Sequence, residues 1–202
     1  MKKALTIGEL LITMAIIGTI ATLVLPGFLK DYHKKLYVTR LKKTVEMLEN
    51  AVNQACIDNN VSYFYQTPYV QPGDGSQQQA FIDKYFRKAS GVNTEPFAAK
   101  YKILNSGIEQ NTNLVSSHGW AKLASGEAIS FYCANSVNFC VFRVDINSTD
   151  GPNIGGRDYF ALFINKNNNE IYDKYEVAEC GTTNDGLGCY ARLLQDNWEM
   201  KY

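Results

Sequence analysis

Glu9 is a lone carboxylate in an apolar run, residues 4–28, which carries no other charge. A charge at the centre of a membrane helix costs about 2.5–3.5 kcal/mol on insertion scales, and less near the helix ends. In an apolar setting an unpaired charge is expensive, so a carboxylate kept there is expected to meet a cation. The alternative is that Glu9 is a charge tolerated at the boundary of a membrane.

Cysteines are the second set of residues with reactive side chains, and four of the five fall into two close pairs. Apolar and polar residues alternate around Cys133 and Cys140, which is typical of β strands. A hairpin that pairs these two cysteines also places Phe131 opposite Phe142 and Ile129 opposite Val144. Because one register satisfies all three pairs on a single face, the sequence favours a Cys133–Cys140 disulfide.

Cys180 and Cys189 flank the glycine-rich segment GTTNDGLG. A disulfide between them closes a ring that the chain-entropy treatment credits with about 2–3 kcal/mol. Cys56 is then left over, and we expect it to be a buried small hydrophobic residue. Five cysteines allow fifteen arrangements of two disulfides, so this connectivity is a prediction. No CxxC or Cys/His spacing indicates zinc binding or redox catalysis.

Residues 145–158, DINSTDGPNIGGRD, are rich in oxygen ligands and suggest a calcium loop. The third acid comes one residue too late for an EF-hand, and no glutamate closes the loop. Asp, Asn and Gly are also the residues that a tight turn between strands requires. Calcium therefore remains a possible cofactor, with a structural turn as the alternative. The candidate ligands are Asp145, Asn147, Asp150, Asn153 and Asp158.

Composition argues against catalysis and against bulk binding of nucleic acid. The 20 basic and 20 acidic residues cancel, and two histidines offer little material for a catalytic site. Ser116-Ser117-His118 is the one cluster that resembles a catalytic site, and it has neither a G-x-S-x-G elbow nor an identifiable acid partner. We do not expect an enzyme.

The N-terminal segment must position Glu9, and it is long enough to cross a membrane. Twenty residues, Leu10 to Leu29, carry no charge and match the length of a membrane-spanning helix. The run is too long for the apolar part of a cleaved secretory signal, and no A-x-A site follows it. A plain anchor leaves Glu9 unexplained, and a helix that is apolar on all faces needs a larger protein around it. Pro26 followed by Gly27 predicts a break in the helix.

Beyond that break, residues 30–58 predict an amphipathic helix that ends near Asp58. Its apolar stripe repeats at spacings of four, three, four and three and is expected to cover a globular portion of the chain. The stripe consists of Leu41, Val45, Leu48, Val52 and Ala55.

The rest of the chain predicts an antiparallel sheet preceded by a connector. Residues 59–126 are interpreted as the connector, with an aromatic stretch at 63–69 that packs on the long helix and a short helix around Phe81, Tyr85 and Ala89. Residues 127–202 alternate with a period of two, which indicates three or four strands, and end in a short helix with Trp198 packed back on the sheet. The predicted fold class is α+β: a long N-terminal helix packed on a small antiparallel sheet.

Residues 1 to about 30 resemble the N-termini of type IV pilin precursors and of the pseudopilins of type II secretion. Those precursors have a short basic leader, then F-T-L-I-E-L, an apolar helix and a proline. Here residues 1–4 correspond to the leader and 5–29 to the polymerisation helix, with Thr6 second, Glu9 fifth and Pro26 twenty-second in the mature chain. The sequence departs from the family at Ala4, where Gly is usual, at Leu5, where Phe is usual, and at Gly8, where a large aliphatic residue is usual.

This resemblance implies a filament subunit processed between Ala4 and Leu5 by a prepilin peptidase. Cleavage creates an α-amino group on Leu5 that is positive or nearly so at neutral pH, and the Glu9 of a neighbouring subunit can neutralise it. Glu9 and Pro26 are then assembly residues. The implied partners are copies of the same or other pilin-like subunits, an assembly platform in the bacterial inner membrane, and lipid. The resemblance also implies a pilin-like fold with a C-terminal loop that is often closed by a disulfide.

The orientation of the chain in the membrane and the class of protein each leave an alternative. Two lysines precede the apolar run, and six Lys or Arg residues and one histidine follow it up to Lys43, an awkward balance for the positive-inside rule. We nevertheless expect a cytoplasmic N-terminus, because the predicted disulfides place the C-terminal portion in an oxidising space, the periplasm or the cell surface. The alternative function is a membrane-anchored adhesin or ligand-binding module that does not assemble into a filament.

Overall fold

The computed structural model describes residues 6–71, 75–112, 118–134 and 139–202. The chain divides into two compact units, residues 1–36 and residues 37–202. We refer to residues 37–202 as the globular unit. The predicted processing residues, Ala4 and Leu5, lie outside the described residues, as do Ser116 and Ser117.

Helix α1, Ile7–Asp58, includes Pro26 in its interior. The break predicted at Pro26–Gly27 is therefore wrong. Proline removes one backbone hydrogen bond and crowds the preceding turn, which is a local cost. The residues on both sides of Pro26 are helical, including Gly27, and the helix is propagated through the defect because each further residue adds its own hydrogen bond.

In the globular unit, α1 buries one face. All five residues of the predicted apolar stripe are buried, and Leu41, Leu48, Val52 and Ala55 have no exposed surface. The helix ends at Asp58, as the sequence predicts. The Asp58 carboxylate lies 2.8 Å from Lys84 Nζ and accepts a hydrogen bond from Tyr85 Oη at 3.0 Å. These contacts fasten the end of α1 to the next helix.

Five antiparallel strands form the sheet, in the order β3-β4-β5-β6-β7. They are β3 Gly119–Lys122, β4 Ala128–Ala134, β5 Phe139–Asp145, β6 Tyr159–Ile164 and β7 Ile171–Tyr172. The predicted register of the first hairpin is confirmed, with Cys133 opposite Cys140, Phe131 opposite Phe142 and Ile129 opposite Val144. The sheet has one strand more than predicted, because β3 lies in the segment interpreted as a connector.

Shorter elements surround this sheet. The predicted helix around Phe81 is α2, Ser76–Tyr85, and it ends before Ala89, whose backbone N–H donates to the Lys122 carbonyl beside β3. The C-terminal helix is α3, Cys189–Gln195, and Trp198 packs on the main apolar cluster with its ring 5.8 Å from that of Tyr190. The remaining elements are β1 Lys100–Lys102, β2 Glu109–Asn111, and the 3₁₀ turns η1 Phe64–Gln66, η2 Pro68–Val70 and η3 Val177–Glu179.

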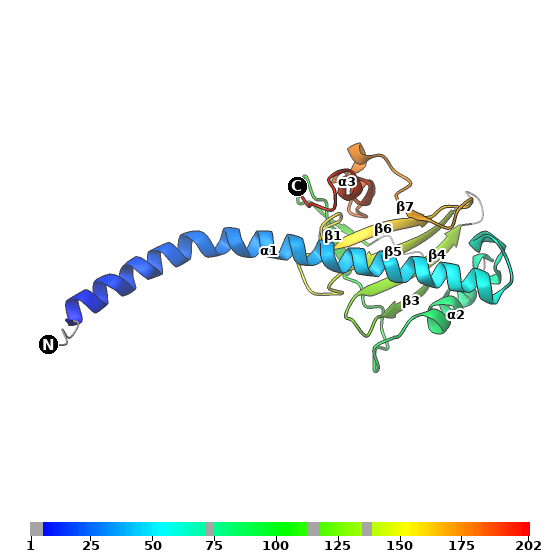
Figure 1. The fold of residues 1–202 in the computed structure, drawn as a ribbon, viewed down its shortest axis with the longest axis horizontal. Helices are drawn as coiled ribbons and strands as arrows, with labels where there is room; N and C mark the ends of the chain where they lie inside the picture. Colours follow the sequence, from blue (N-terminus) through cyan, green and yellow to red (C-terminus); the bar gives the residue numbers. More distant parts are fainter. Residues whose placement is uncertain (1–5, 72–74, 113–117, 135–138) are drawn as a thin grey trace. The chain divides into compact units, whose positions relative to one another are not determined.

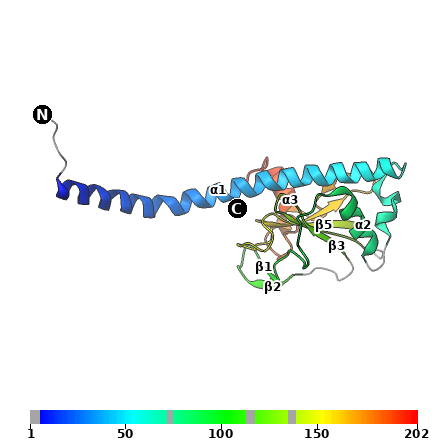
Figure 2. The same cartoon turned by 90° about the horizontal axis from the view of Figure 1, so that it is seen from below.

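The two faces of the sheet are covered differently (Figures 1 and 2). Within the globular unit, α1 lies over one face, where aromatic side chains from the strands pack with those of η1 and α2. The rings of Phe131 and Phe142 stack there at 4.6 Å, with Phe64 and Phe81 beside them. The segment with β1 and β2 covers part of the other face, where Tyr101 stacks on Tyr159 at 4.0 Å.

Candidate assembly segment and the loops of the globular unit

Glu9 and Thr6 cap the N-terminus of α1. The backbone N–H and the hydroxyl of Thr6 both donate to Glu9 Oε2, each at 2.9 Å, and the Glu9 N–H donates to Thr6 Oγ1 at 3.2 Å. This reciprocal pattern is the capping box of the sequence S/T-x-x-E, which satisfies backbone donors that a helix start leaves unpaired. This local role of Glu9 was not predicted from the sequence, although the spacing Thr6-Ile7-Gly8-Glu9 contains its signal.

The segment Ile7–Leu29 exposes its apolar side chains all around the helix. Every residue in it is exposed except Ala21, and Ile7 and Leu23 reach 80% and 82%. By length and composition this segment can cross a membrane. A helix that is apolar on all faces requires an apolar medium or partner, because water makes such a surface unfavourable.

Polar groups within this segment are paired along the helix itself. Thr13, Thr19 and Thr22 each donate a hydroxyl hydrogen bond to the carbonyl three residues earlier, at 2.8, 2.8 and 2.9 Å. In a hydrocarbon environment such internal bonds remove the cost of an unpaired hydroxyl group. The helix from residue 10 to residue 29 therefore presents no polar side chain without a hydrogen-bond partner.

The loop 145–158, all of which the structure describes, is organised by its own hydrogen bonds. Asp158 accepts from the backbone N–H groups of Asn153 and Ile154 at 2.8 and 2.7 Å. Asp145 accepts from the Asn147 N–H at 3.1 Å and from the Tyr101 hydroxyl. The Asn147 side-chain amide donates to the carbonyls of Asp150 and Gly151 at 2.6 and 2.7 Å, so it joins two parts of the loop.

These residues do not fit a calcium site. Burial raises the pKa of Asp145 to about 8 and also raises the pKa of Asp158. Among the buried side-chain acceptors of this loop, the two left without a hydrogen-bond partner are amide oxygens, on Asn147 and Asn153. Calcium takes six to eight oxygen ligands with several carboxylates among them. No group of three acidic, His or Cys side chains suited to a metal occurs among the described residues.

Both predicted disulfides are present. Cys133 is bonded to Cys140 and Cys180 to Cys189. The second disulfide lies against Gly156, which has a φ of +84° and where a Cβ atom would come within 2.3 Å of the Cys189 sulfur. Glycine is required there because no other residue combines that backbone conformation with so close an approach.

The loop between Cys180 and Cys189 is also fastened to the sheet by charge. Arg143 on β5 lies 3.0 Å from the Asp185 carboxylate and donates to the Tyr159 hydroxyl at 3.2 Å. Both ionic side chains are largely buried, so removing either one would leave an uncompensated charge. Asn184 in the same loop donates to the carbonyl of Asn111 at 3.0 Å, which joins the loop to β2.

Cys56 and His118 each contact a segment that is distant in the sequence. Cys56 is a free thiol, is buried as predicted, and burial raises its pKa. The Asn169 amide approaches its sulfur at 3.6 Å, which links α1 to the turn after β6. His118 Nε2 lies 3.2 Å from the Glu95 carboxylate, and the His118 side chain is 3% exposed. The serines next to His118 in the sequence are outside the described residues.

Comparisons with protein-family models, with curated proteins and with solved structures found no match to this chain. What the chain itself defines is an α+β globular unit with two disulfides, preceded by a helical segment long and apolar enough to cross a membrane.

Proposed function

We propose that this protein is a structural subunit of a type IV pilus-like or type II secretion pseudopilus filament. In this proposal it is stored in the bacterial inner membrane, trimmed between Ala4 and Leu5 by a prepilin peptidase, and polymerised through the apolar part of α1. The mature subunit stands in a periplasmic or cell-surface filament with copies of itself or with other pilin-like subunits. Its role is structural, and its assembly requires a platform protein in the membrane.

The observation that carries the proposal is the exposed apolar surface of Ile7–Leu29, a segment that begins at the capping box formed by Thr6 and Glu9. Lipid can cover this surface while the subunit is stored, and equivalent helices can cover it in a bundle. Either medium is apolar, so transfer between them changes little hydrophobic free energy. The specificity of a bundle must then come from packing and from polar groups, and Glu9 is the charged side chain between residues 6 and 29.

Glu9 can serve both the cap and an intermolecular ion pair. The two hydrogen bonds from Thr6 both end on Oε2, which leaves Oε1 to accept from another group. A mature N-terminus at Leu5 would carry a cation whose pairing with the Glu9 of a neighbour fixes the axial register of the two helices. The cap holds the carboxylate near the helix axis, which reduces the side-chain entropy lost on pairing.

The disulfides support a globular unit outside the cytoplasm. Disulfides persist in oxidising compartments such as the bacterial periplasm and are rare in the cytosol. A single spanning segment at residues 7–29 then leaves the N-terminus in the cytoplasm, where a prepilin leader is expected.

The first test is the intact mass and the N-terminal sequence of the protein recovered from its native membrane. The proposal expects a chain that starts at Leu5, with or without one methyl group on its amine. A chain that still starts at Met1 in assembled material would contradict processing and would leave a simple anchor.

A second test separates the charge of Glu9 from its capping role. Glu9→Gln retains a side chain that can complete the capping box but removes the charge, whereas Thr6→Val removes the cap and keeps the charge. The proposal expects Glu9→Gln to reduce the yield of filaments sheared from cells by tenfold or more, as loss of about 1.4 kcal/mol per contact would do. Thr6→Val is expected to reduce it far less. The opposite ranking would assign Glu9 to helix capping alone.

A further inference from the structure

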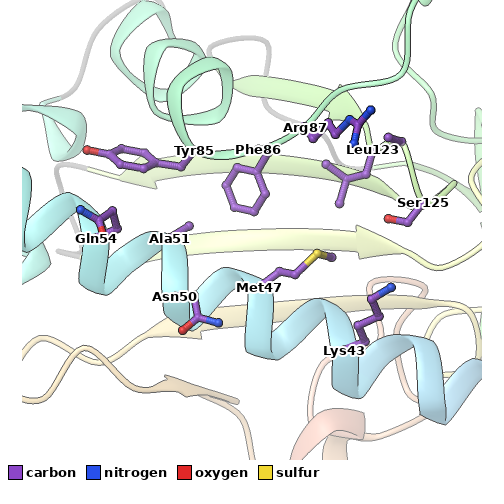
Figure 3. A pocket seen from close by; sticks show the side chains of 11 residues that line it. Lys43, Met47, Asn50, Ala51, Gln54, Tyr85, Phe86, Arg87, Leu123 and Ser125 are labelled. Carbon is purple, nitrogen blue, oxygen red and sulfur yellow. The ribbon is translucent and has the colours of Figure 1, made fainter.

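A groove of about 540 Å³ lies in the globular unit between α1 and the segments that follow α2 and β3. Figure 3 shows Met47 and Ala51 on the α1 side, with Phe86 and Leu123 facing them from the opposite wall. Lys43 lies at the end of the α1 side and Arg87 on the opposite wall. The groove is therefore apolar inside with cationic side chains at its rim.

The charged side chains that line this groove are all cationic. None of its eleven lining residues is acidic. Within the part of the chain that the structure describes, neither Lys43 nor Arg87 forms a salt bridge, whereas Lys84 and Lys88 nearby are each paired with an aspartate. A surface that combines apolar walls with unneutralised cations fits a partner that offers apolar side chains and carboxylates.

The other flank of α1 carries acidic side chains, opposite in charge to those of the groove. Residues 43, 47, 50 and 54 form the stripe along the groove, and residues 46, 49, 53 and 57 form the next stripe around the helix. This second stripe carries Glu46, Glu49 and, 71% exposed, Ile57. Glu49 accepts a hydrogen bond from the backbone of Ile171 on β7, and Glu170 lies close by.

Among the residues that the structure describes, the glutamates on that flank form no salt bridge with a cationic side chain. Burial raises the pKa of Glu49, and the adjacent Glu170 and Glu46 carboxylates raise it further. The cation on the same flank, Lys42, lies over the Trp198 ring at 5.8 Å. We call Glu46, Glu49, Ile57 and Glu170 the acidic flank.

The positions of the two surfaces decide how copies can meet. The groove lies at the β3 edge of the sheet and the acidic flank at the β7 edge, which are the two ends of the strand order. A two-fold axis through the groove would place Lys43 and Arg87 against their own copies, which like charges disfavour. Contact between groove and flank is heterologous, and a heterologous contact repeats from copy to copy in a helix or a ring.

We propose that the groove at Lys43, Met47, Phe86, Arg87 and Leu123 receives the acidic flank of a second copy of this chain. The choice of a second copy rests on the proposed function, and the contact adds an interface between globular units to the one between apolar helices. Lys43 and Arg87 pair with the glutamates of the neighbour, and its Ile57 adds apolar surface to the groove.

The experiment uses charge reversal in the full-length chain, expressed in cells that assemble the filament. The groove variant is Lys43→Glu/Arg87→Glu and the flank variant is Glu46→Lys/Glu170→Lys. All four side chains are exposed, so the fold is expected to tolerate the changes. Each variant alone faces like charges across the contact and is expected to lose filament yield by about tenfold or more.

Restoration is the decisive result. The chain with all four changes has both charges inverted and is expected to return to within about twofold of the wild-type yield, since the pairs are reformed with opposite sign. The groove and flank variants produced together in one cell should also co-assemble, and pulling down a tag on one should recover the other. The matched control is Lys102→Glu/Glu109→Lys, which exchanges the charges of an exposed salt bridge between β1 and β2 and should not change the yield.

The failures of the two proposals are distinguishable. Filaments that form equally well from the wild type and from both single-surface variants would overturn the groove contact and leave the filament function standing. Loss in both variants without restoration in the fourfold variant or in the mixture would also overturn the contact. A wild-type chain that never forms filaments overturns the proposed function itself.

Discussion

From Ile7 to Leu29, α1 exposes apolar side chains on every face, whereas from Tyr37 to Cys56 it buries one stripe of them. The backbone conformation is helical in both regions, so secondary structure does not distinguish them. The second region meets the sheet of its own chain, and its polar residues stay in water. The first region exposes its apolar side chains all around the helix. Sequence periodicity therefore reports the medium that a helix needs as well as its conformation.

The largest expected contrast comes from shortening one leucine in each region. Leu48→Ala removes a side chain with no exposed surface and is expected to lower the free energy of unfolding of the globular unit by about 2–5 kcal/mol. Leu11→Ala, at a side chain that is 63% exposed, is expected to change it by less than about 0.5 kcal/mol. Denaturant unfolding of the full chain in detergent measures both. Similar losses for the two variants would mean that residues 7–29 contribute to the globular unit.

The second prediction concerns the disulfides, which among the described residues lie in the globular unit. Cys180→Ser/Cys189→Ser opens the ring that holds the loop with Asp185 and is expected to lower the free energy of unfolding by about 2–4 kcal/mol. The helix content of the apolar segment, followed by hydrogen exchange, should stay unchanged. The matched control is Cys56→Ala, which removes the free thiol and leaves both disulfides in place. A smaller loss in the disulfide variant than in this control would contradict a stabilising role for the ring.

The third prediction concerns the pH dependence of the globular unit. The folded-state pKa of Asp145 is about 8, above the value near 3.9 of an unfolded chain, because the group is buried. Such a group contributes stability below the unfolded-state pKa, and this contribution is lost as the pH rises through the folded-state pKa. Stability should therefore fall between pH 4 and pH 8. Asp145→Asn should make the decrease in the free energy of unfolding between pH 4 and pH 8 smaller by more than about 1 kcal/mol, since one pKa unit corresponds to 1.36 kcal/mol.

The control for that prediction is the exposed Asp150 in the same loop. Asp150→Asn should leave the pH profile of the free energy of unfolding parallel to that of the wild type. If Asp145→Asn also gave a parallel profile, Asp145 would be ionised in the folded chain and would interact with a cation.

The smallest expected effect is that of calcium. Because the carboxylates of the loop 145–158 accept hydrogen bonds from Tyr101 and from backbone N–H groups, millimolar calcium is expected to change the unfolding temperature by less than about 1 °C. Saturating a native-state site at a hundred times its dissociation constant would stabilise by about 2.7 kcal/mol, a shift that a thermal scan resolves. A rise of several degrees that a chelator reverses would restore the calcium interpretation.

The sequence by itself determined the features that depend on neighbours along the chain. The stripe at Leu41, Val45, Leu48, Val52 and Ala55 follows from helical periodicity. The Cys133–Cys140 register follows from alternation along two strands that a short hairpin joins. In both cases the partner lies within a few residues or on a face that the period fixes, so local pattern is sufficient.

Tertiary structure decided the features that depend on distant segments. Strand β3 is short, and it becomes a strand because β4 and the segment after α2 flank it. One carboxylate oxygen of Asp145 accepts a hydrogen bond from the hydroxyl of Tyr101, 44 residues earlier in the chain, and the other accepts from the nearby Asn147 N–H. The groove beside Met47 exists because Phe86 and Leu123 are brought opposite α1. Contacts between residues so far apart leave no periodic signal in the sequence, because only the folded chain sets their distance.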